Sequence, residues 1–330
     1  MSFVTDIKKR AAENLRRIIL PESEDARILK AAANALEEKY ADIILLGKKE
    51  TVLSDAEKLG ISLAGAEIID PETSEKLDAY AAKLAELRGH KGMTFEKART
   101  TMIEDQTVFG VMAVKMGDAD GLVSGACHTS ANMLRPVLQI IKTDPSKMLV
   151  SNAFVFDIPD KSFGADGVIL CADCALNQDP TSEELAEIAA DSAETFEALV
   201  GKKARVAFLS HSSFGSATHP LVEKVSKAVA IAKERHPEYM IDGEMQLDAA
   251  LIPEVAASKA PDSDVAGKAN VLIFPNIDAG NIGYKLIQRI GHAEAYSLIQ
   301  GLNAPCNDIS RGCLWEDVAG VIAITSLQVR

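Results

Sequence analysis

Aromatic residues and long apolar runs are scarce in this sequence. Aromatics make up 5% of its 330 residues, and Trp315 is the only tryptophan. Aliphatic side chains must therefore build most of the core, as they do in parallel sheets whose strands are rich in valine, isoleucine and leucine. No apolar run approaches the roughly 18 residues of a membrane-spanning helix, and the N-terminus has neither the basic nor the apolar region of a signal peptide. We therefore expect a cytoplasmic protein that does not bind membranes.

Basic residues are also in deficit. Lysine and arginine total 35 against 48 aspartate and glutamate residues, which gives a formal net charge of −13. Such a charge argues against non-specific binding to nucleic acid or to an anionic membrane surface. A small anionic ligand remains compatible with it, provided that arginines gather locally against the overall field.

The cysteines and histidines lack the spacing of metal sites. The cysteine count is odd, and only Cys171 and Cys174 form a CxxC pair, which stands within an apolar run and has no second pair. We predict that this pair lies in a buried core, that the thiols are reduced, and that the protein binds no metal.

Glycine-rich fingerprints are missing too. No GxGxxG joins a strand to a helix and no GxxxxGKS or GxxxxGKT occurs, which disfavours a dinucleotide site and an ATP-binding loop.

Short apolar runs alternate with longer stretches of helical periodicity along most of the chain. This alternation predicts βαβ units, and hence an α/β fold with a largely parallel, doubly wound sheet. Among the expected elements are one long helix over 94–116 and a helix that follows Gly283 toward Leu298. The polar stretch 142–147 is the best candidate for a linker, because the pattern restarts after it. Residues 301–330 are too few for a separate domain and must pack onto an earlier part of the chain.

Three loops rich in small residues follow predicted strands. They span residues 124–130, 210–216 and 275–283. In open α/β sheets, ligands bind where strands end and helices begin, because free N–H groups and the helix dipole attract anions. Ordinary N-capped turns give the same pattern. Three such loops on one chain nevertheless favour an anion-binding site.

The segment 305–318 places the hydroxyl of Ser310 beside the guanidinium of Arg311, with the carboxylate of Asp317 at the head of an expected helix. Taken alone, this pattern fits an N-capped helix with a surface arginine equally well. The whole chain, however, closely resembles the phosphate acetyltransferase (phosphotransacetylase) family. The resemblance is carried by Arg27 and by the segments 20–22, 120–126, 134–136, 242–244, 258–261, 280–285 and 307–312.

The resemblance implies two three-layer αβα domains with largely parallel sheets, of the isocitrate and isopropylmalate dehydrogenase type, with the active site in the cleft between them. Domain I is expected to comprise residues 1–147 and 301–330. Domain II, inserted into it, is expected to comprise residues 148–300 and to mediate a homodimer. The implied reaction is the reversible transfer of an acetyl group between acetyl-CoA and phosphate, which yields CoA and acetyl phosphate. Coenzyme A is then a substrate, and no permanently bound cofactor is expected.

The resemblance also implies roles for individual residues. The residue matching Asp317 is taken as the base that deprotonates the CoA thiol, Ser310 as the group that positions the reactant, and Arg311 as the one that stabilises developing negative charge. A cysteine that some family members carry is replaced here by Lys161, so no role of that thiol is carried over. The expected ligands of phosphate or CoA are Arg27, Arg88, Arg135, Arg289, Thr129 and Ser130.

Thiol chemistry explains why Asp317 would need Arg311. A free thiol has a pKa of about 8.5 and an aspartic acid one of about 3.9, a mismatch worth roughly 6 kcal/mol. The gap narrows if Arg311 favours the thiolate and if burial raises the pKa of Asp317. No nucleophile of the chain stands beside an obvious base, so we expect direct transfer in a ternary complex. Cys313, acting through an acyl-enzyme, is the competing candidate.

Three other functions compete with this one. A phosphate butyryltransferase would share the arginines but need a roomier acyl pocket. A decarboxylating dehydrogenase would need a nicotinamide and a divalent metal, for which Asp242, Asp248 and Asp278 form no convincing cluster. A non-catalytic CoA-binding regulatory module would not require the three reactive residues around Ser310.

Overall fold

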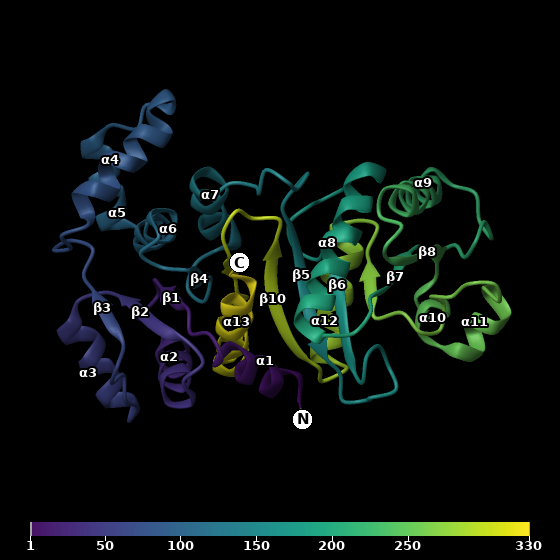
Figure 1. The fold of residues 1–330 in the computed structure, drawn as a ribbon, viewed down its shortest axis with the longest axis horizontal. Helices are drawn as coiled ribbons and strands as arrows, with labels where there is room; N and C mark the ends of the chain where they lie inside the picture. Colours follow the sequence, from purple (N-terminus) through teal and green to yellow (C-terminus); the bar gives the residue numbers. More distant parts are fainter. Residues whose placement is uncertain (1, 330) are drawn as a thin grey trace. The chain divides into compact units, whose positions relative to one another are not determined.

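The computed structural model describes residues 2–329. The chain divides into two compact units, each with its own sheet and its own helices (Figure 1). Unit 1 comprises Met1–Asp144 and Leu302–Arg330, and unit 2 comprises Pro145–Gly301. The predicted fold class, α/β with two largely parallel sheets, is confirmed.

Unit 1 is built on a five-stranded sheet in which all neighbouring strands run parallel. The order is β11-β4-β1-β2-β3, so the strand from the C-terminal segment lies at one edge. Its partner is β4, and Asp308 stands opposite Ser124 in their register. The bounds are β1 (Arg17–Leu20), β2 (Asp42–Leu46), β3 (Glu67–Ile69), β4 (Gly121–Ser124) and β11 (Cys306–Asp308).

The stretch expected to be one long helix, 94–116, forms two helices, so that prediction is wrong. Asp105 ends the first helix with an extended backbone, and its carboxylate accepts the N–H of Thr107 at 2.9 Å. An aspartate that caps a new helix competes with continuing the old one. The helices of unit 1 are α1 (Phe3–Ala11), α2 (Ala26–Glu38), α3 (Lys49–Leu59), α4 (Leu77–Arg88), the 3₁₀ turn η1 (Gly89–Lys91), α5 (Phe95–Glu104), α6 (Gln106–Met116), α7 (Ser130–Ile140) and α13 (Trp315–Gln328).

The C-terminal segment packs into unit 1, as the sequence predicts for residues too few to fold alone. α13 packs against α1, α2 and β4. The Asn307 side chain on β11 donates to Thr325 Oγ1 at 2.8 Å and to Gln328 Oε1 at 2.7 Å, which ties strand to helix. A Cβ on Gly121 would lie 2.6 Å from the Thr325 methyl, so only glycine allows this close approach. This packing fixes the position of the turn between β11 and α13.

Unit 2 contains a six-stranded sheet of order β10-β5-β6-β9-β7-β8. Its β10–β5 and β5–β6 pairs are antiparallel and the others parallel. Cys171 and Cys174 are fully buried in its core, as predicted for the CxxC pair. The elements are β5 (Ser151–Asp157), β6 (Val168–Ala172), α8 (Ser182–Val200), β7 (Arg205–Leu209), α9 (Pro220–Arg235), β8 (Met240–Met245), α10 (Leu247–Leu251), α11 (Pro253–Lys259), β9 (Val271–Ile273), α12 (Ile277–Arg289) and β10 (Glu294–Gln300).

The helix expected to run from Gly283 toward Leu298 is also wrong. α12 ends at Arg289, and His292 adopts a left-handed backbone conformation that stops the helical path. The following residues form β10, which pairs with β5 over its whole length. Long-range pairing therefore overrides the local helical pattern there.

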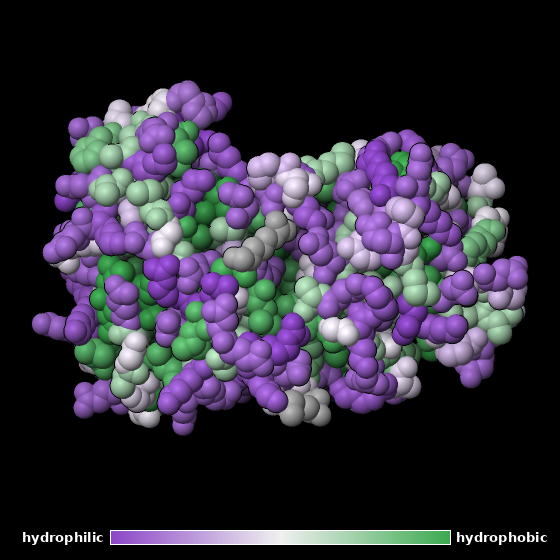
Figure 2. All heavy atoms as spheres, viewed as in Figure 1, coloured by the Kyte–Doolittle hydropathy of each residue, from purple (hydrophilic) through white to green (hydrophobic). Residues whose placement is uncertain are grey.

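Polar side chains dominate the surface face seen in Figure 2, with hydrophobic residues visible in patches between them. None of the helices formed by residues 2–329 is long and apolar enough to span a membrane.

Candidate active site

Ser310 and Arg311 lie in the short turn between β11 and α13, and Asp317 lies in the first turn of α13. The Ser310 hydroxyl accepts the N–H of Gly312 at 3.3 Å, which tightens the turn. The Asp317 carboxylate accepts the N–H of Leu314 at 2.8 Å and so caps the helix start. Both side chains thus shape the local backbone, and the expected trio lies on one continuous segment.

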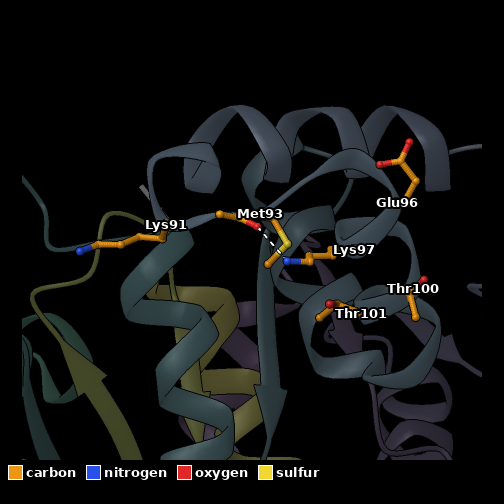
Figure 3. Close-up of a pocket in the computed structure, with 7 residues that line it drawn as sticks. Lys91, Met93, Glu96, Lys97, Thr100 and Thr101 are labelled. Carbon is orange, nitrogen blue, oxygen red and sulfur yellow. Dashed lines mark hydrogen bonds between the residues drawn. The ribbon is translucent and has the colours of Figure 1, made fainter.

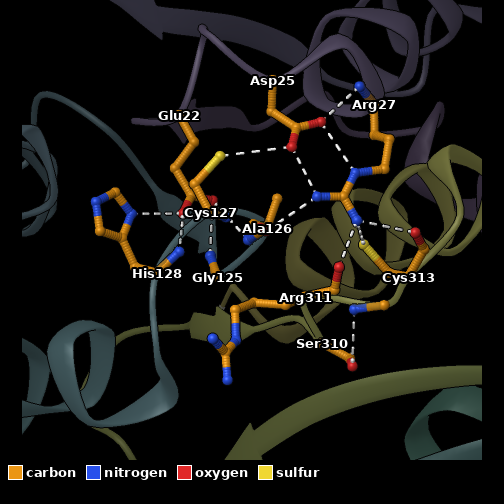
Figure 4. Close-up of polar contacts among 11 residues, drawn as sticks. Glu22, Asp25, Arg27, Gly125, Ala126, Cys127, His128, Ser310, Arg311 and Cys313 are labelled. Atoms are coloured by element: carbon orange, nitrogen blue, oxygen red, sulfur yellow. Dashed lines mark hydrogen bonds and ion pairs between the residues drawn. The ribbon is translucent and has the colours of Figure 1, made fainter.

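Arg27 ties this turn to the rest of unit 1 (Figure 4). Its Nη1 donates to the carbonyl oxygens of Arg311 at 2.7 Å and Cys313 at 3.1 Å. Its Nη2 donates to the carbonyl of Ala126 at 2.9 Å and to Asp25 at 2.7 Å, and its Nε donates to Asp25 at 3.0 Å. These bonds engage all five N–H groups of a guanidinium. The hydrogen bonds from Arg27 also lower the pKa of Asp25.

Arg311 presents the opposite case. Only its backbone carbonyl faces Arg27, while its side chain extends away from that guanidinium (Figure 4). The side chain is exposed, and within residues 2–329 its guanidinium forms no hydrogen bond or ion pair. An unpartnered arginine beside a rigid turn is suited to bind an anion or to face developing negative charge.

Glu22 fills the first of the three predicted anion loops (Figure 4). Its buried carboxylate accepts the backbone N–H groups of Gly125 at 2.7 Å, Ala126 at 2.8 Å, Cys127 at 2.9 Å and His128 at 3.2 Å. The His128 ring nitrogen Nδ1 lies 2.7 Å from the same carboxylate. The loop does bind an anion, but that anion is a side chain of the protein.

A second carboxylate does the same in unit 2. Glu244 is buried and accepts the Ser212 hydroxyl and the N–H of Gly215, each at 2.8 Å. In the third loop, the Asn276 side chain accepts the N–H of Ala279 at 3.0 Å as an ordinary helix cap. Buried carboxylates therefore occupy the N–H groups of residues 125–128 and of Gly215, which leaves these particular groups unavailable to a ligand, and anion binding by the rest of the loops stays a prediction.

The remaining predicted ligands are spread over both units. Thr129 caps α7 by accepting the N–H of Asn132 at 3.3 Å, and Ser130 is exposed beside it. Arg135 is exposed on α7, and Arg88 is the last residue of α4. Within residues 2–329, neither guanidinium forms an ion pair or hydrogen bond. Arg289 ends α12 in unit 2.

A pocket of about 510 Å³ opens just after Arg88, along η1 and the start of α5 (Figure 3). Two lysines and two threonines line it, which gives it positive charge and hydrogen-bond donors. Sequence reasoning missed this pocket, because no motif marks the segment. Its lining residues are Lys91, Gly92, Met93, Glu96, Lys97, Thr100 and Thr101.

Two further groups near the turn titrate abnormally. Burial raises the pKa of the Cys313 thiol to about 11, with Arg27 opposing and Asp317 adding to the shift. Burial also raises the pKa of Asp308 to about 7. Sequence reasoning missed both Asp308 and Glu22 as parts of this site, although both belong to segments that it singled out. Within the described part of the chain, no cluster of three or more His, Cys, Asp or Glu side chains could hold a metal ion.

Replacing Glu22 tests the role of the buried carboxylate. Glu22→Ala leaves four buried or half-buried N–H groups without their acceptor, so we expect a loss of about 3–5 kcal/mol in the free energy of unfolding. Urea denaturation measures it. Glu24→Ala, at an exposed neighbouring position, is the matched control and should change stability by less than about 0.5 kcal/mol. Equal, small effects of the two substitutions would show that the loop does not depend on Glu22.

The chain has close relatives over its full length. The family model described as phosphate acetyl/butaryl transferase matches residues 2–326. The chain is 52% identical to a phosphate acetyltransferase of Thermoanaerobacterium thermosaccharolyticum, with 100% of both chains covered, and 52% identical to one of Acetivibrio thermocellus, with 100% of this chain and 99% of that one covered. A phosphotransacetylase structure from Streptococcus pyogenes superposes with a TM-score of 0.91 at 42% identity, covering 99% of this chain and 98% of that one.

A more distant structure shows the fold alone. A 4-hydroxythreonine-4-phosphate dehydrogenase from Salmonella typhimurium, described as putative, aligns with a TM-score of 0.55 at 12% identity, over 96% of this chain and 100% of that one. Fold likeness at that distance says nothing of chemistry. The family match over nearly the whole chain and the two relatives at 52% identity carry the assignment: the chain belongs to the phosphate acetyl/butaryl transferase family.

Proposed function

We propose that this protein is a phosphate acetyltransferase, which transfers an acetyl group reversibly between acetyl-CoA and phosphate. The full-length identity to proteins of that name carries the proposal. The site supports it, because an unpartnered arginine, a hydroxyl and a carboxylate share one turn and helix start. The relatives at 52% and 49% identity are phosphate acetyltransferases, which favours acetyl over butyryl as the acyl group.

The proposed step is attack of the CoA thiolate on the carbonyl carbon of acetyl phosphate. Asp317 accepts the thiol proton, the new C–S bond forms, and the bond between the carbonyl carbon and the phosphate oxygen breaks. Phosphate leaves with the electron pair of that bond. Arg311 faces the negative charge that builds on the carbonyl oxygen and on the leaving phosphate, and Ser310 positions the reactant. In the reverse direction, phosphate attacks acetyl-CoA and the thiolate recovers its proton from Asp317.

Most of the other predicted arginines are proposed to bind the phosphate groups of the substrates. Arg88 and Arg135 have guanidinium groups that the described residues leave unpartnered, which supports their proposed contact with the phosphate groups of the substrates. Lys91 and Lys97 add positive charge to the pocket beside Arg88, and we propose that this region binds a phosphate group of CoA. The same proposal covers Arg289 of unit 2, together with Thr129 and Ser130 at the start of α7.

Arg27 fits a different role from the one that the family resemblance suggests. Its five donors are engaged with Asp25 and with three backbone carbonyls. Direct binding of phosphate would break some of these bonds. The geometry favours an arginine that holds the Ser310–Cys313 turn in place, so contact with CoA or phosphate stays a prediction for this residue.

We further propose a homodimer, formed through α12. Ile282 and Leu286 of this helix and Ile290, its C-cap residue, stand four residues apart and are 61%, 51% and 72% exposed. The opposite face is anchored in unit 2, where Tyr284 stacks on Phe154 with ring centroids 4.2 Å apart. An apolar stripe on a well-anchored helix is typical of a protein–protein contact, and the implied dimer supplies the partner, a second copy.

The cell compartment and the absence of a resident cofactor complete the proposal. All five cysteines are unpaired, which supports a reducing compartment such as the cytoplasm. Coenzyme A is consumed and released as a substrate, and the proposed chemistry uses only side chains of this chain. We therefore propose no permanently bound cofactor.

The decisive assay follows consumption of the CoA thiol with acetyl phosphate. We expect phosphate-releasing turnover in the wild type and a loss of at least about 100-fold in kcat for Arg311→Ala, because a donor facing the transition state is removed. Arg135→Ala should mainly raise KM. Arg235→Ala removes a surface arginine of α9 that pairs with Glu187 and serves as control. Absence of phosphate-dependent turnover in the wild type would sink the proposed function.

Replacement of Cys313 separates direct transfer from an acyl-enzyme. With a pKa of about 11, about one Cys313 thiol in ten thousand is ionised at pH 7, and the side chain is 7% exposed. We expect Cys313→Ala to retain kcat within about threefold, as does Cys306→Ala, its buried control on β11. Collapse of turnover in the first variant alone would establish an acyl-enzyme instead.

The dimer is tested by sedimentation. Leu286→Glu together with Ile290→Glu places two charges on the exposed stripe of α12, so we expect the wild type to sediment as a dimer and the variant as a monomer. Leu221→Glu changes a residue that is 49% exposed on α9 and should leave the dimer intact. A wild-type monomer, or a dimer that survives both charges, would refute the proposed surface.

A further inference from the structure

Two buried polar atoms belong to neighbouring residues of β4 and β11, and within the described residues neither has a hydrogen-bond partner. Ser124 and Asp308 are register partners at the ends of these parallel strands, so their side chains lie on the same side of the sheet. Ser124 is fully buried and Asp308 is 8% exposed. Within residues 2–329, neither Ser124 Oγ nor Asp308 Oδ1 makes a hydrogen bond. Unpartnered polar atoms at such depth are rare and call for an explanation.

The position of this pair links it to the proposed transfer site. Asp308 precedes Ser310 by two residues, and a Cβ on Gly125 would lie 2.5 Å from its Oδ1. The hydroxyl of Ser130, at the start of α7, is the neighbour that favours its ionised form. Asp308 therefore lies between the turn that carries Ser310 and the loop that leads to α7.

The charges around Asp308 disfavour a second buried anion. Glu22, from the segment after β1, lies close enough to raise its pKa, whereas Glu316 and Asp317 in the first turn of α13 are not among the groups that shift it. Arg311, three residues further along the chain, is exposed and is not among the groups that shift the pKa of Asp308. Two other basic groups of the site are bonded elsewhere. Arg27 of α2 binds Asp25 and backbone carbonyls, and the His128 ring of the 124–130 loop contacts Glu22.

β4 and β11 offer no compensating charge, and Arg135 of α7 is exposed and is not among the groups that shift the pKa of Asp308. β4 contributes the uncharged Ser124, and the nearest polar side chain of α7 is Ser130. Arg17 on β1 is bonded to Asp120, at the beginning of the strands rather than at the end that holds Asp308. A buried carboxyl group without a cation partner is more stable when protonated.

We propose that Asp308 is a positioning residue that carries a proton in the active enzyme and, in this neutral form, holds the 124–130 loop beside the turn of Ser310 and Arg311. The proton removes the buried charge and gives Asp308 a donor of its own, so that either Ser124 or Asp308 can donate to the other. Loss of the proton places a second anion beside Glu22, which displaces the loop. This inference rests on the proposed acetyltransferase function only for its activity readout.

The first experiment compares kcat of the wild type and Asp308→Asn between pH 6 and pH 8. The amide has the shape of the neutral acid but cannot ionise, so we expect similar kcat at pH 6. The ratio of variant to wild type should rise at least threefold by pH 8, because a group with a pKa of about 7 loses its proton over this range. Asp42→Asn, at an exposed position on β2, controls for the loss of one charge. A constant ratio, or a variant that is inactive at both pH values, would overturn the inference.

The second experiment needs no activity. The pKa of Asp308 is 3.8 in its unperturbed state and about 7 when folded, so the wild type binds one proton more when folded than when unfolded between these values. The stability from this group is complete below the unfolded pKa and is lost as the pH rises to about 7. The Tm of Asp308→Asn relative to the wild type should therefore rise by several degrees from pH 4.5 to pH 7.5 and then level off. A flat difference would show that Asp308 is ionised in the folded protein. If the wild type lacks turnover, the proposed function fails, and this experiment still decides the protonation.

Discussion

The carboxylate of Glu22 is the contact on which the rest of this site depends. It binds the N–H groups of residues 125–128, an arrangement that elsewhere holds a phosphate or another free anion. Because the protein supplies its own anion, the loop is fixed before any ligand arrives. The start of α7 and the carbonyl that Arg27 binds at Ala126 are thereby set, and with them the turn that carries Arg311. The backbone of the site is thus positioned by one buried negative charge, the Glu22 carboxylate.

Much of the fold follows from local patterns, and the errors occur where local and long-range interactions compete. The alternation of apolar runs and helical stretches correctly predicts an α/β fold with largely parallel strands, because buried parallel strands are continuously apolar. The break at Asp105 is missed, since one capping carboxylate outweighs a continuous helical periodicity. β10 is missed for the opposite reason: its residues suit a helix locally, and only pairing with β5 makes them a strand. Such pairing cannot be read from the segment itself.

The sequence predicts which residue types form the site, but not which arginine is bonded within the protein and which is available to a ligand. The resemblance of the chain to its family marked Arg27 and Arg311 alike as ligands of negatively charged groups. Among the residues that the structure describes, the Arg27 guanidinium forms five hydrogen bonds and the Arg311 guanidinium forms none. Sequence does not distinguish them, because the acceptors of Arg27 are mostly backbone carbonyls from two distant segments, at Ala126 and at Arg311–Cys313. For the same reason Glu22 reads as one acidic residue among 48 aspartates and glutamates. Its importance comes from four N–H groups about a hundred residues away.

In a protein this acidic, an arginine without a carboxylate partner is an informative exception. With 48 acidic and 35 basic residues, a surface arginine readily finds a carboxylate, as Arg17 and Arg99 do. A guanidinium without such a partner keeps its donors for a ligand, and it loses less when it binds one because no ion pair must first be broken. The negative charge of the whole protein repels phosphate and CoA at long range, yet screening limits that repulsion beyond roughly 8 Å at physiological salt. Selectivity for anions can therefore depend on a few arginines that form no ion pair with carboxylates of the described residues. Arg27 contributes to this selectivity indirectly. Its hydrogen bonds hold the turn in place, so the Arg311 side chain is not needed for that purpose and can bind an anion.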